Sequence, residues 1–109
     1  MIVLTCMCVP RPGQADECRA AARELTERSR DHQGLLGYLW NVDESTGNLH
    51  LVEVHEGEAS VLNHIAQADV SRLVAAGALG DIKLYGDEPS PALLDVLRGF
   101  GEYTRYRAV

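Results

Sequence analysis

The sequence predicts an α+β fold in which helices cover one face of an antiparallel sheet. Short apolar runs that are typical of strands alternate along the chain with longer stretches of helical periodicity. Glycine and proline stand between these segments, where turns are expected. The 109 residues, 46% of them hydrophobic and 24% charged, have the composition of a single globular domain.

The first strand and the first helix are marked by their boundaries. Residues 1–9 are almost entirely apolar, which predicts a strand that is buried on both faces, and Pro10 and Pro12 end it. Gly13 then begins a helix that extends to about His32, because apolar residues recur at helical spacing on one side of it.

Two strands joined by a tight turn are expected after Gly34. Residues 36–42 are rich in apolar and aromatic side chains, and residues 44–48 have the composition of a turn. The strand pattern resumes over residues 49–55.

The second strand of this pair has two different faces. Val52 and Val54 point to one side of the sheet, because alternate residues of a strand share a face. Leu51, Glu53 and His55 point to the other side. Ionisable residues beside leucine predict that this second side lines a partly polar cavity, where function is expected to lie.

The next segment predicts one helix and one short strand. Apolar residues between 61 and 74 form a helical stripe, which Asp69 interrupts because aspartate favours helix caps over helix interiors. Gly77 and Gly80 are expected to end this helix, and residues 82–85 to form a fourth strand.

The C-terminal segment predicts a last helix. Ser90 suits the N-cap, Pro91 the first helical position and Gly99 the C-terminal end. Residues 102–109 are either a final strand or an arm.

This order of elements is the split β-α-β arrangement of a ferredoxin-like α+β sandwich. Helices cover only one face of such a sheet, yet the first strand predicts that the opposite face is apolar as well. The simplest cover for that face is the sheet of a second copy, so the sequence predicts a homodimer.

Charge and cysteine content limit the partners and the compartment. The formal net charge of -6 repels phosphate backbones and anionic lipids, so neither nucleic acid nor a membrane surface is an expected partner. The apolar N-terminal run is too short to span a bilayer and has no basic residues before it. Cys6 and Cys8 share one face of a strand, a poor geometry for a disulfide, so we expect them and Cys18 to be reduced in a cytoplasmic protein.

Three motifs occur in an order that is typical of one protein family. Residues 11–14, Arg-Pro-Gly-Gln, resemble its Pro-Gly start of the first helix, and Gly34 followed by Tyr38 resembles its start of the second strand. Residues 53–56, Glu-Val-His-Glu, with His64 nine positions after His55, resemble its third strand and the helical histidine that follows. The chain therefore resembles the antibiotic biosynthesis monooxygenases, which are dimeric α/β barrels.

The resemblance covers about residues 1–86 of a single domain that comprises residues 1–109. Residues 87–109, introduced by Tyr-Gly-Asp at positions 85–87, resemble a C-terminal extension that some members carry.

Members of this family oxidise quinols and polyketide phenols with O2 and without a cofactor. The resemblance implies a small aromatic substrate and O2, with Glu53 and His64 as the candidate catalytic residues. Members that oxidise polyketide phenols carry Trp, Asn and Tyr at the positions of His55, Leu51 and Val61, so their exact substrate is not expected here.

Several further side chains are candidates for substrate binding. Tyr38 and Trp40 are either core residues or a ligand platform, and Asn41 either orients a ligand or is simply exposed. The full set of expected substrate-binding residues is Leu51, His55, Trp40, Tyr38, Asn41 and Val61.

Other site chemistries are less favoured. Glu53, His55 and His64 form a two-histidine, one-carboxylate set, but nothing in their spacing requires a metal ion. Haem is disfavoured by an aromatic fraction of 6% and by the lack of a basic patch for its propionates. The prediction is therefore a cofactor-independent monooxygenase, and its alternative is a non-catalytic dimeric module that binds a small apolar ligand.

Overall fold

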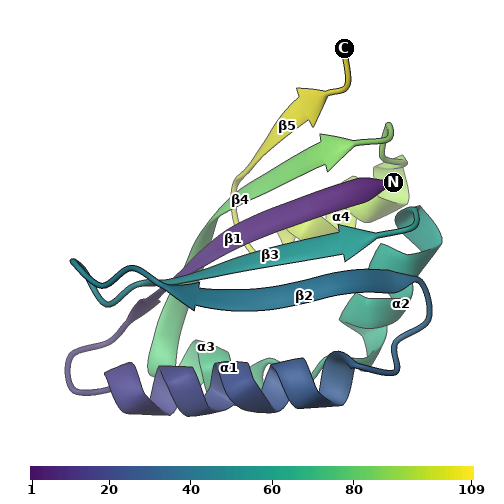
Figure 1. The fold of residues 1–109 in the computed structure, drawn as a ribbon. Helices are drawn as coiled ribbons and strands as arrows, with labels where there is room; N and C mark the ends of the chain where they lie inside the picture. The colour runs from purple at the N-terminus through teal and green to yellow at the C-terminus, as the bar shows by residue number, and fades with distance from the viewer.

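The computed structural model describes residues 1–109 and contains one five-stranded sheet and four helices. The strand order is β2-β3-β1-β4-β5, so the N-terminal strand lies at the centre of the sheet (Figure 1). The predicted ferredoxin-like α+β fold is confirmed, and the sheet does not close on itself.

The strands are β1 (Ile2–Pro10), β2 (Leu35–Val42), β3 (Leu49–His55), β4 (Gly77–Gly86) and β5 (Tyr103–Arg107). The helices are α1 (Ala15–Ser29), α2 (Glu58–Gln67), α3 (Ser71–Ala76) and α4 (Pro91–Arg98).

The prediction of a fully antiparallel sheet is wrong at one edge. β1 pairs antiparallel with both β3 and β4, and β2 pairs antiparallel with β3, but β5 runs parallel to β4. The reason is α4, which follows β4 and carries the chain back so that β5 runs in the same direction. The C-terminal tail is thus a strand, and the rings of Tyr85 and Tyr106 stack 4.8 Å apart across the parallel pair.

The interruption predicted at Asp69 is confirmed. Its carboxylate accepts hydrogen bonds from the backbone N–H of Ser71 at 3.0 Å and from the Ser71 hydroxyl at 2.6 Å. These bonds favour a new helix start over continuation of α2. Ser90 caps α4 as expected, accepting a hydrogen bond from the N–H of Leu93 at 3.3 Å.

Two element boundaries differ from the sequence-based expectation. α1 ends at Ser29, so His32 belongs to the loop that leads to β2. β4 begins directly after α3, at Gly77, and includes both glycines that were expected to end the helix. Glycine tolerates extended backbone as well as turns, so the residue type alone does not distinguish a helix end from a strand start.

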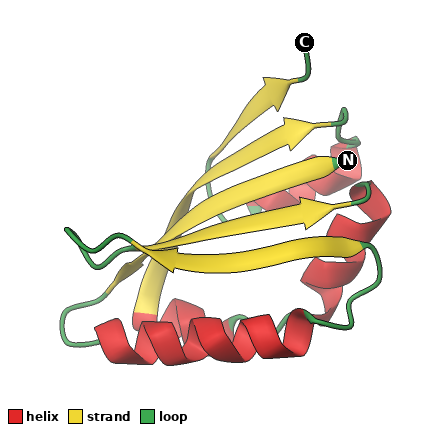
Figure 2. Ribbon diagram, viewed as in Figure 1, coloured by secondary structure: helices red, strands yellow, loops and turns green.

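The helices lie against one face of the sheet, which we call the inner face, and leave the outer face uncovered (Figure 2). The outer face carries exposed apolar side chains on β2, where Leu39 is 62% exposed. None of the helices is both long enough and apolar enough to cross a membrane.

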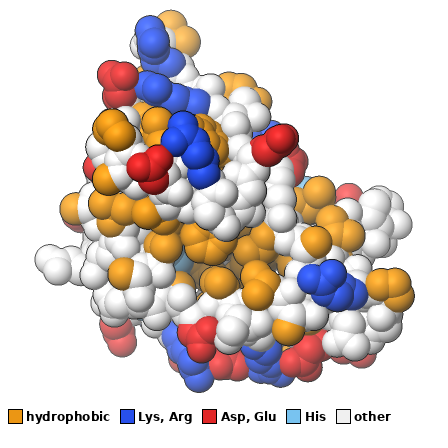
Figure 3. Space-filling model, turned by 180° about the vertical axis from the view of Figure 1, so that it is seen from behind, with side chains coloured by type: hydrophobic (Ala, Val, Ile, Leu, Met, Phe, Trp, Pro, Cys, Tyr) orange, Lys and Arg blue, Asp and Glu red, His pale blue; other side chains and the backbone are white.

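The core between the sheet and the helices consists of two separate clusters. The first lies under α1 and α3 and comprises Cys8, Cys18, Ala21, Ala22, Leu25, Leu49, Leu73 and Ala76. The second lies under α2 and α4 and comprises Ile2, Leu4, Val61, Ile82, Leu84, Leu93 and Leu97. Viewed from behind, the molecule shows apolar side chains gathered in a central hollow (Figure 3).

Candidate functional site

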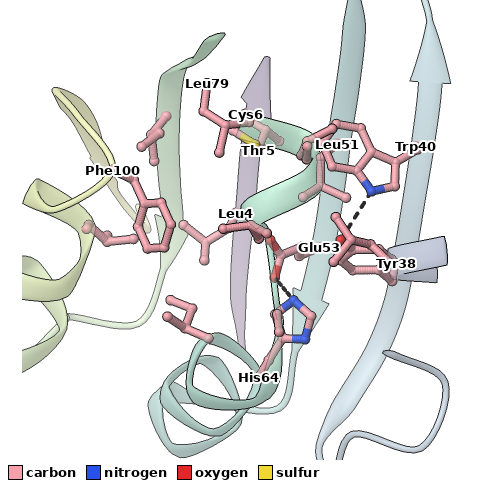
Figure 4. A pocket seen from close by; sticks show the side chains of 17 residues that line it. Leu4, Thr5, Cys6, Tyr38, Trp40, Leu51, Glu53, His64, Leu79 and Phe100 are labelled. Atoms are coloured by element: carbon pink, nitrogen blue, oxygen red, sulfur yellow. Dashed lines mark hydrogen bonds and ion pairs between the residues drawn. The ribbon is translucent and has the colours of Figure 1, made fainter. Parts of the chain in front are cut away.

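A cavity of about 90 Å³ lies where the two core clusters meet. Of the 17 residues that line it, 14 are hydrophobic, and the other three are Thr5, Glu53 and His64 (Figure 4). The sheet supplies most of one wall, and residues of α2 and of the C-terminal segment supply others. The partly polar cavity that the β3 pattern predicts is therefore present.

A β-bulge lies beside this cavity. The pairing of β1 with β4 shifts register between Thr5 and Met7, and Asp81 on β4 has a φ of 49°, in the left-handed region. Bulges bend a strand and re-aim its side chains, and they are common beside binding sites. The extra residue is on β4, because Asp81 and Ile82 lie opposite the single residue Cys6 of β1. Thr5, Cys6 and Ile82 all line the cavity.

The carboxylate of Glu53 is the centre of the polar cluster. Its side chain is 12% exposed, and its Oε1 accepts a hydrogen bond from Nε2 of His55 at 2.9 Å. Nε2 of His64 lies 3.5 Å from the same oxygen, on the cavity side. Two imidazoles thus flank one carboxylate in a largely apolar pocket, where an unpaired charge would be costly.

His55 lies at the end of β3, yet it is not exposed to solvent there. It is fully buried, and it does not line the cavity. Its Nδ1 lies 2.7 Å from the hydroxyl of Ser60 on α2, and its Nε2 bonds to Glu53. The resulting order of serine, histidine and carboxylate resembles a nucleophilic triad, but Ser60 does not line the cavity either. His55 therefore bridges Glu53 and Ser60 and is not part of the cavity lining.

His64 combines burial with several ionisable neighbours. Its side chain is 5% exposed, and this burial lowers the pKa of the imidazole; the nearby Glu53 carboxylate opposes that shift. His32 and His55 lower the pKa further. A neutral His64 can accept a proton, and it lies at the cavity wall where a ligand would contact it.

Tyr38 and Trp40 line the cavity from β2. The indole N–H of Trp40 donates to the Tyr38 hydroxyl oxygen at 3.1 Å, and the two rings pack edge to face. Burial raises the pKa of Tyr38, and the negative charge of Glu53 raises it further. Tyr38 therefore stays protonated, and its O–H can donate a hydrogen bond to an oxygen atom of a bound ligand.

Three further residues were expected to bind the substrate, and only one of them lines the cavity. Leu51 lies in the wall, next to Trp40. Asn41 is exposed and points away, with its amide donating to the carbonyl oxygen of His50 at 3.4 Å. Val61 is fully buried in the second core cluster and does not line the cavity. The alternation of β2 places Asn41, and the rotation of α2 places Val61, outside the cavity lining.

The sequence interpretation missed other residues of the site. Leu97 and Phe100, from the C-terminal extension, complete the cavity wall, which means that the extension is part of the site. His32 lies behind His64, with the two Nδ1 atoms 2.7 Å apart. No sequence signal links a loop histidine to a helix more than thirty residues later, so this contact becomes evident only in three dimensions.

The cavity wall contains one thiol as well as side chains of types that can bind metal ions. No group of three or more His, Cys, Asp or Glu side chains is arranged to hold a metal ion. Burial raises the pKa of Cys6 to about 12, so the thiol at the cavity wall is neutral and a poor nucleophile. All three cysteines are free.

By sequence, the chain matches no protein-family model and no curated protein. Its structure is similar to that of MupZ from Pseudomonas fluorescens, with a TM-score of 0.77 and 18% identity over 99% of this chain and 89% of that one. A crystal structure of an antibiotic biosynthesis monooxygenase has a TM-score of 0.68 and 23% identity, covering 84% of this chain and 100% of that one. Rv0793 from Mycobacterium tuberculosis has a TM-score of 0.62 and 16% identity, covering 83% and 97%.

These similarities agree with the order of elements described above. The MupZ match covers nearly the whole chain and so includes the C-terminal helix and strand. The other two matches cover less of it. The chain therefore has the fold of the antibiotic biosynthesis monooxygenases.

Proposed function

We propose that this protein is a cofactor-independent monooxygenase that oxidises a small phenolic or quinol substrate with O2. One observation carries the proposal: the Glu53 carboxylate lies at the wall of a small apolar cavity and is held between two imidazoles. Buried ionisable groups of this kind are typical of sites that transfer protons. The fold shared with antibiotic biosynthesis monooxygenases supports the same reaction class.

The first step is removal of the hydroxyl proton of the substrate by Glu53. The anion that forms is electron-rich and transfers one electron to O2, which gives a substrate radical and superoxide. These two combine at an unsubstituted ring carbon para to the oxygen and form a C–O bond. The proton transfer requires a base at hydrogen-bonding distance from the substrate hydroxyl, and the position of Glu53 in the cavity wall supports this role.

The second step eliminates water. Protonation of the terminal oxygen gives a hydroperoxide; loss of the ring C–H proton then forms the new carbonyl, and the O–O bond breaks. Hydroxide leaves and takes up a proton. Overall, one O–H and one C–H of the substrate together with O2 become two carbonyl groups and one water, so the substrate loses four electrons and O2 gains four.

The cavity wall supports both steps. Its 14 hydrophobic residues exclude water from the anion and the radical pair, and low polarity strengthens each remaining electrostatic contact. The Tyr38 hydroxyl, kept protonated by burial, is positioned to donate to an oxygen of the substrate or of the peroxide. Exclusion of water and hydrogen-bond donation thus both come from side chains of the protein itself.

A second function is favoured by the same apolar wall. With 14 of 17 lining residues hydrophobic, the cavity also suits a non-catalytic dimeric module that binds a small apolar ligand. In that case the only role of Glu53 is to provide a polar partner for the buried side chains of His55 and His64.

The decisive experiment measures O2 uptake with a panel of dihydroxynaphthalenes and anthrones, without flavin, metal or haem. Mass spectrometry is expected to find a product that has gained one oxygen and lost two hydrogens. Glu53→Gln is expected to lower kcat/KM by roughly 100-fold or more, the usual scale for loss of a general base. The matched control is Glu56→Gln, an exposed glutamate just beyond the same strand, which is expected to change little.

Two results would contradict the proposal. If wild-type protein binds one of these compounds but consumes no O2 with any of them, the binding module is the better description. If Glu53→Gln retains full activity while Glu53→Ala merely unfolds more easily, then Glu53 is a structural partner of the two histidines.

A further inference from the structure

His32 lies outside the cavity, on the side of His64 that faces away from Glu53. It is half-buried in the loop between α1 and β2, so part of its side chain is exposed to solvent. Its Nδ1 is 2.7 Å from Nδ1 of His64, and the two ring centroids are 4.9 Å apart. The other nitrogen of His64, Nε2, faces Glu53. His64 thus connects the carboxylate on one side with His32 on the other.

The short distance between the two histidines restricts where protons can lie. Two N–H groups cannot face each other at 2.7 Å, so one Nδ1 donates while the other accepts. Each imidazole can accept a proton on one nitrogen and release one from the other. A pair in this arrangement can therefore pass a proton from Glu53 to the outer histidine.

We infer that His64 and His32 form a proton relay that connects the buried Glu53 carboxylate with solvent. This inference rests on the proposed function, because it describes how Glu53, the general base of that reaction, gains and loses protons. His32 acts through His64 and does not touch the substrate, whereas His64 lines the cavity.

The relay moves one proton in three linked transfers. Protonated Glu53 gives its proton to Nε2 of His64, and His64 releases the proton on its Nδ1 to Nδ1 of His32. His32 then releases a proton from Nε2 to solvent, and the carboxylate is restored by a path that does not pass through the substrate cavity. The reverse sequence returns a proton when water forms at the end of the reaction.

The contact between Glu53 and His64 is the longest in the relay, at 3.5 Å. Catalytic hydrogen bonds are often long without substrate and shorten when the site is occupied. The charged and titratable groups that face His64 are Glu53 and His55 on β3, Tyr38 on β2 and His32 on the loop. Among these, only His32 leads away from the cavity towards solvent.

The first test needs no substrate. Histidine ¹⁵N spectra of the ligand-free protein report the tautomer and the titration of each imidazole. His32→Gln keeps a polar side chain that cannot relay a proton, and it is expected to change both the tautomer and the titration of His64. The matched control is His50→Gln, an exposed histidine on the outer face of β3, which is expected to leave the His64 signals unchanged. Unchanged His64 signals in His32→Gln would overturn the relay.

The second test uses the O2-uptake assay. His32→Gln is expected to lower kcat several-fold with little change in KM and to increase the solvent deuterium isotope effect. In His32→Ala, added imidazole is expected to restore activity, because it can occupy the vacated space and carry the proton. His50→Gln is expected to match the wild type in each measurement. Wild-type kcat and isotope effect in His32→Gln, or no rescue of a slow His32→Ala, would overturn the relay.

The two tests separate this inference from the proposed function. If the spectra show coupled histidines but no compound in the panel supports O2 uptake, the monooxygenase proposal fails and the proton path to Glu53 stands. If O2 uptake depends on Glu53 but replacing His32 changes neither the His64 spectra nor the rates, the proposed function stands and the relay fails.

Discussion

The two faces of the sheet differ although the same strands form both. On the inner face, β3 presents Leu51, Glu53 and His55 to helices and to a cavity, and each polar group there has a partner. On the outer face, β2 and β3 present apolar side chains that nothing in this chain covers, with Leu39 62% exposed. The inner face thus holds the cavity and its paired polar groups, whereas the outer face leaves apolar side chains exposed.

This difference shows how a small domain can contain a site without losing its core. The cavity lies between two compact clusters, so its polar groups do not interrupt either one. Removing the polar network is expected to change only the inner face, and covering the outer face is expected to leave the inner face unchanged. Four predictions use this separation.

The largest effect is expected on the outer face. We propose that a second copy covers it and that the homodimer buries more than roughly 1,000 Å² in total. Replacing Leu39 by Arg places a charge on the apolar outer face and is expected to convert the dimer to monomers in sedimentation experiments at micromolar concentration. Thr46→Arg, in the exposed turn between β2 and β3, is the control. A wild-type protein that sediments as a monomer would contradict the dimer.

The second prediction compares two histidines on opposite faces of β3. His55→Leu leaves Glu53 and the Ser60 hydroxyl without their buried partner, at a cost of about 1–3 kcal/mol for each unsatisfied group. Both variants are made in the monomeric Leu39→Arg background, where no second copy covers the outer face. There His50→Leu, at an exposed position, is expected to change the free energy of unfolding by less than about 0.5 kcal/mol. Urea unfolding measures both. Equal effects at the two positions would mean that the buried network contributes no stability.

The third prediction compares two glycines of β4. A Cβ added at Gly77 would lie 2.5 Å from Sγ of Cys8 and 3.0 Å from Sγ of Cys18, inside the first core cluster. Gly77→Ala is therefore expected to destabilise the protein by about 1–3 kcal/mol through overpacking. Nothing lies within 4 Å of the Cβ position at Gly80, so Gly80→Ala is expected to be nearly neutral. Thermal unfolding distinguishes the two, and a neutral Gly77→Ala would show that the cluster is loosely packed.

The smallest effect is a pH dependence caused by His64. Burial lowers its folded-state pKa below the ordinary value of 6.5. Between these two values the unfolded chain binds more protons than the folded one, so stability rises with pH through this window and falls as the solution is acidified below about 6.5. His64→Gln is expected to flatten this part of the stability profile, whereas His50→Gln keeps it. An unchanged profile in His64→Gln would contradict the assigned direction.

The sequence alone determined the order of elements and the two faces of β3. Period-two alternation over residues 49–55 places Glu53 on the inner face because side chains alternate along any strand. Local chemistry also marked the break at Asp69 and the cap at Ser90, since both depend on residues close in sequence. Glu53, His64, Tyr38, Trp40 and Leu51 were all expected at the site, and all line the cavity.

Only the tertiary structure decided which of these side chains meet. The direction of β5 depends on where α4 lies, and no alternation pattern distinguishes a parallel edge strand from an antiparallel one. The placement of Val61 away from the cavity follows from the rotation of α2, which packing determines. The contact of His32 with His64 joins a loop to a distant helix, and the cavity wall at Phe100 comes from the C-terminal segment. Such contacts depend on how elements pack against one another, and local sequence patterns do not contain that information.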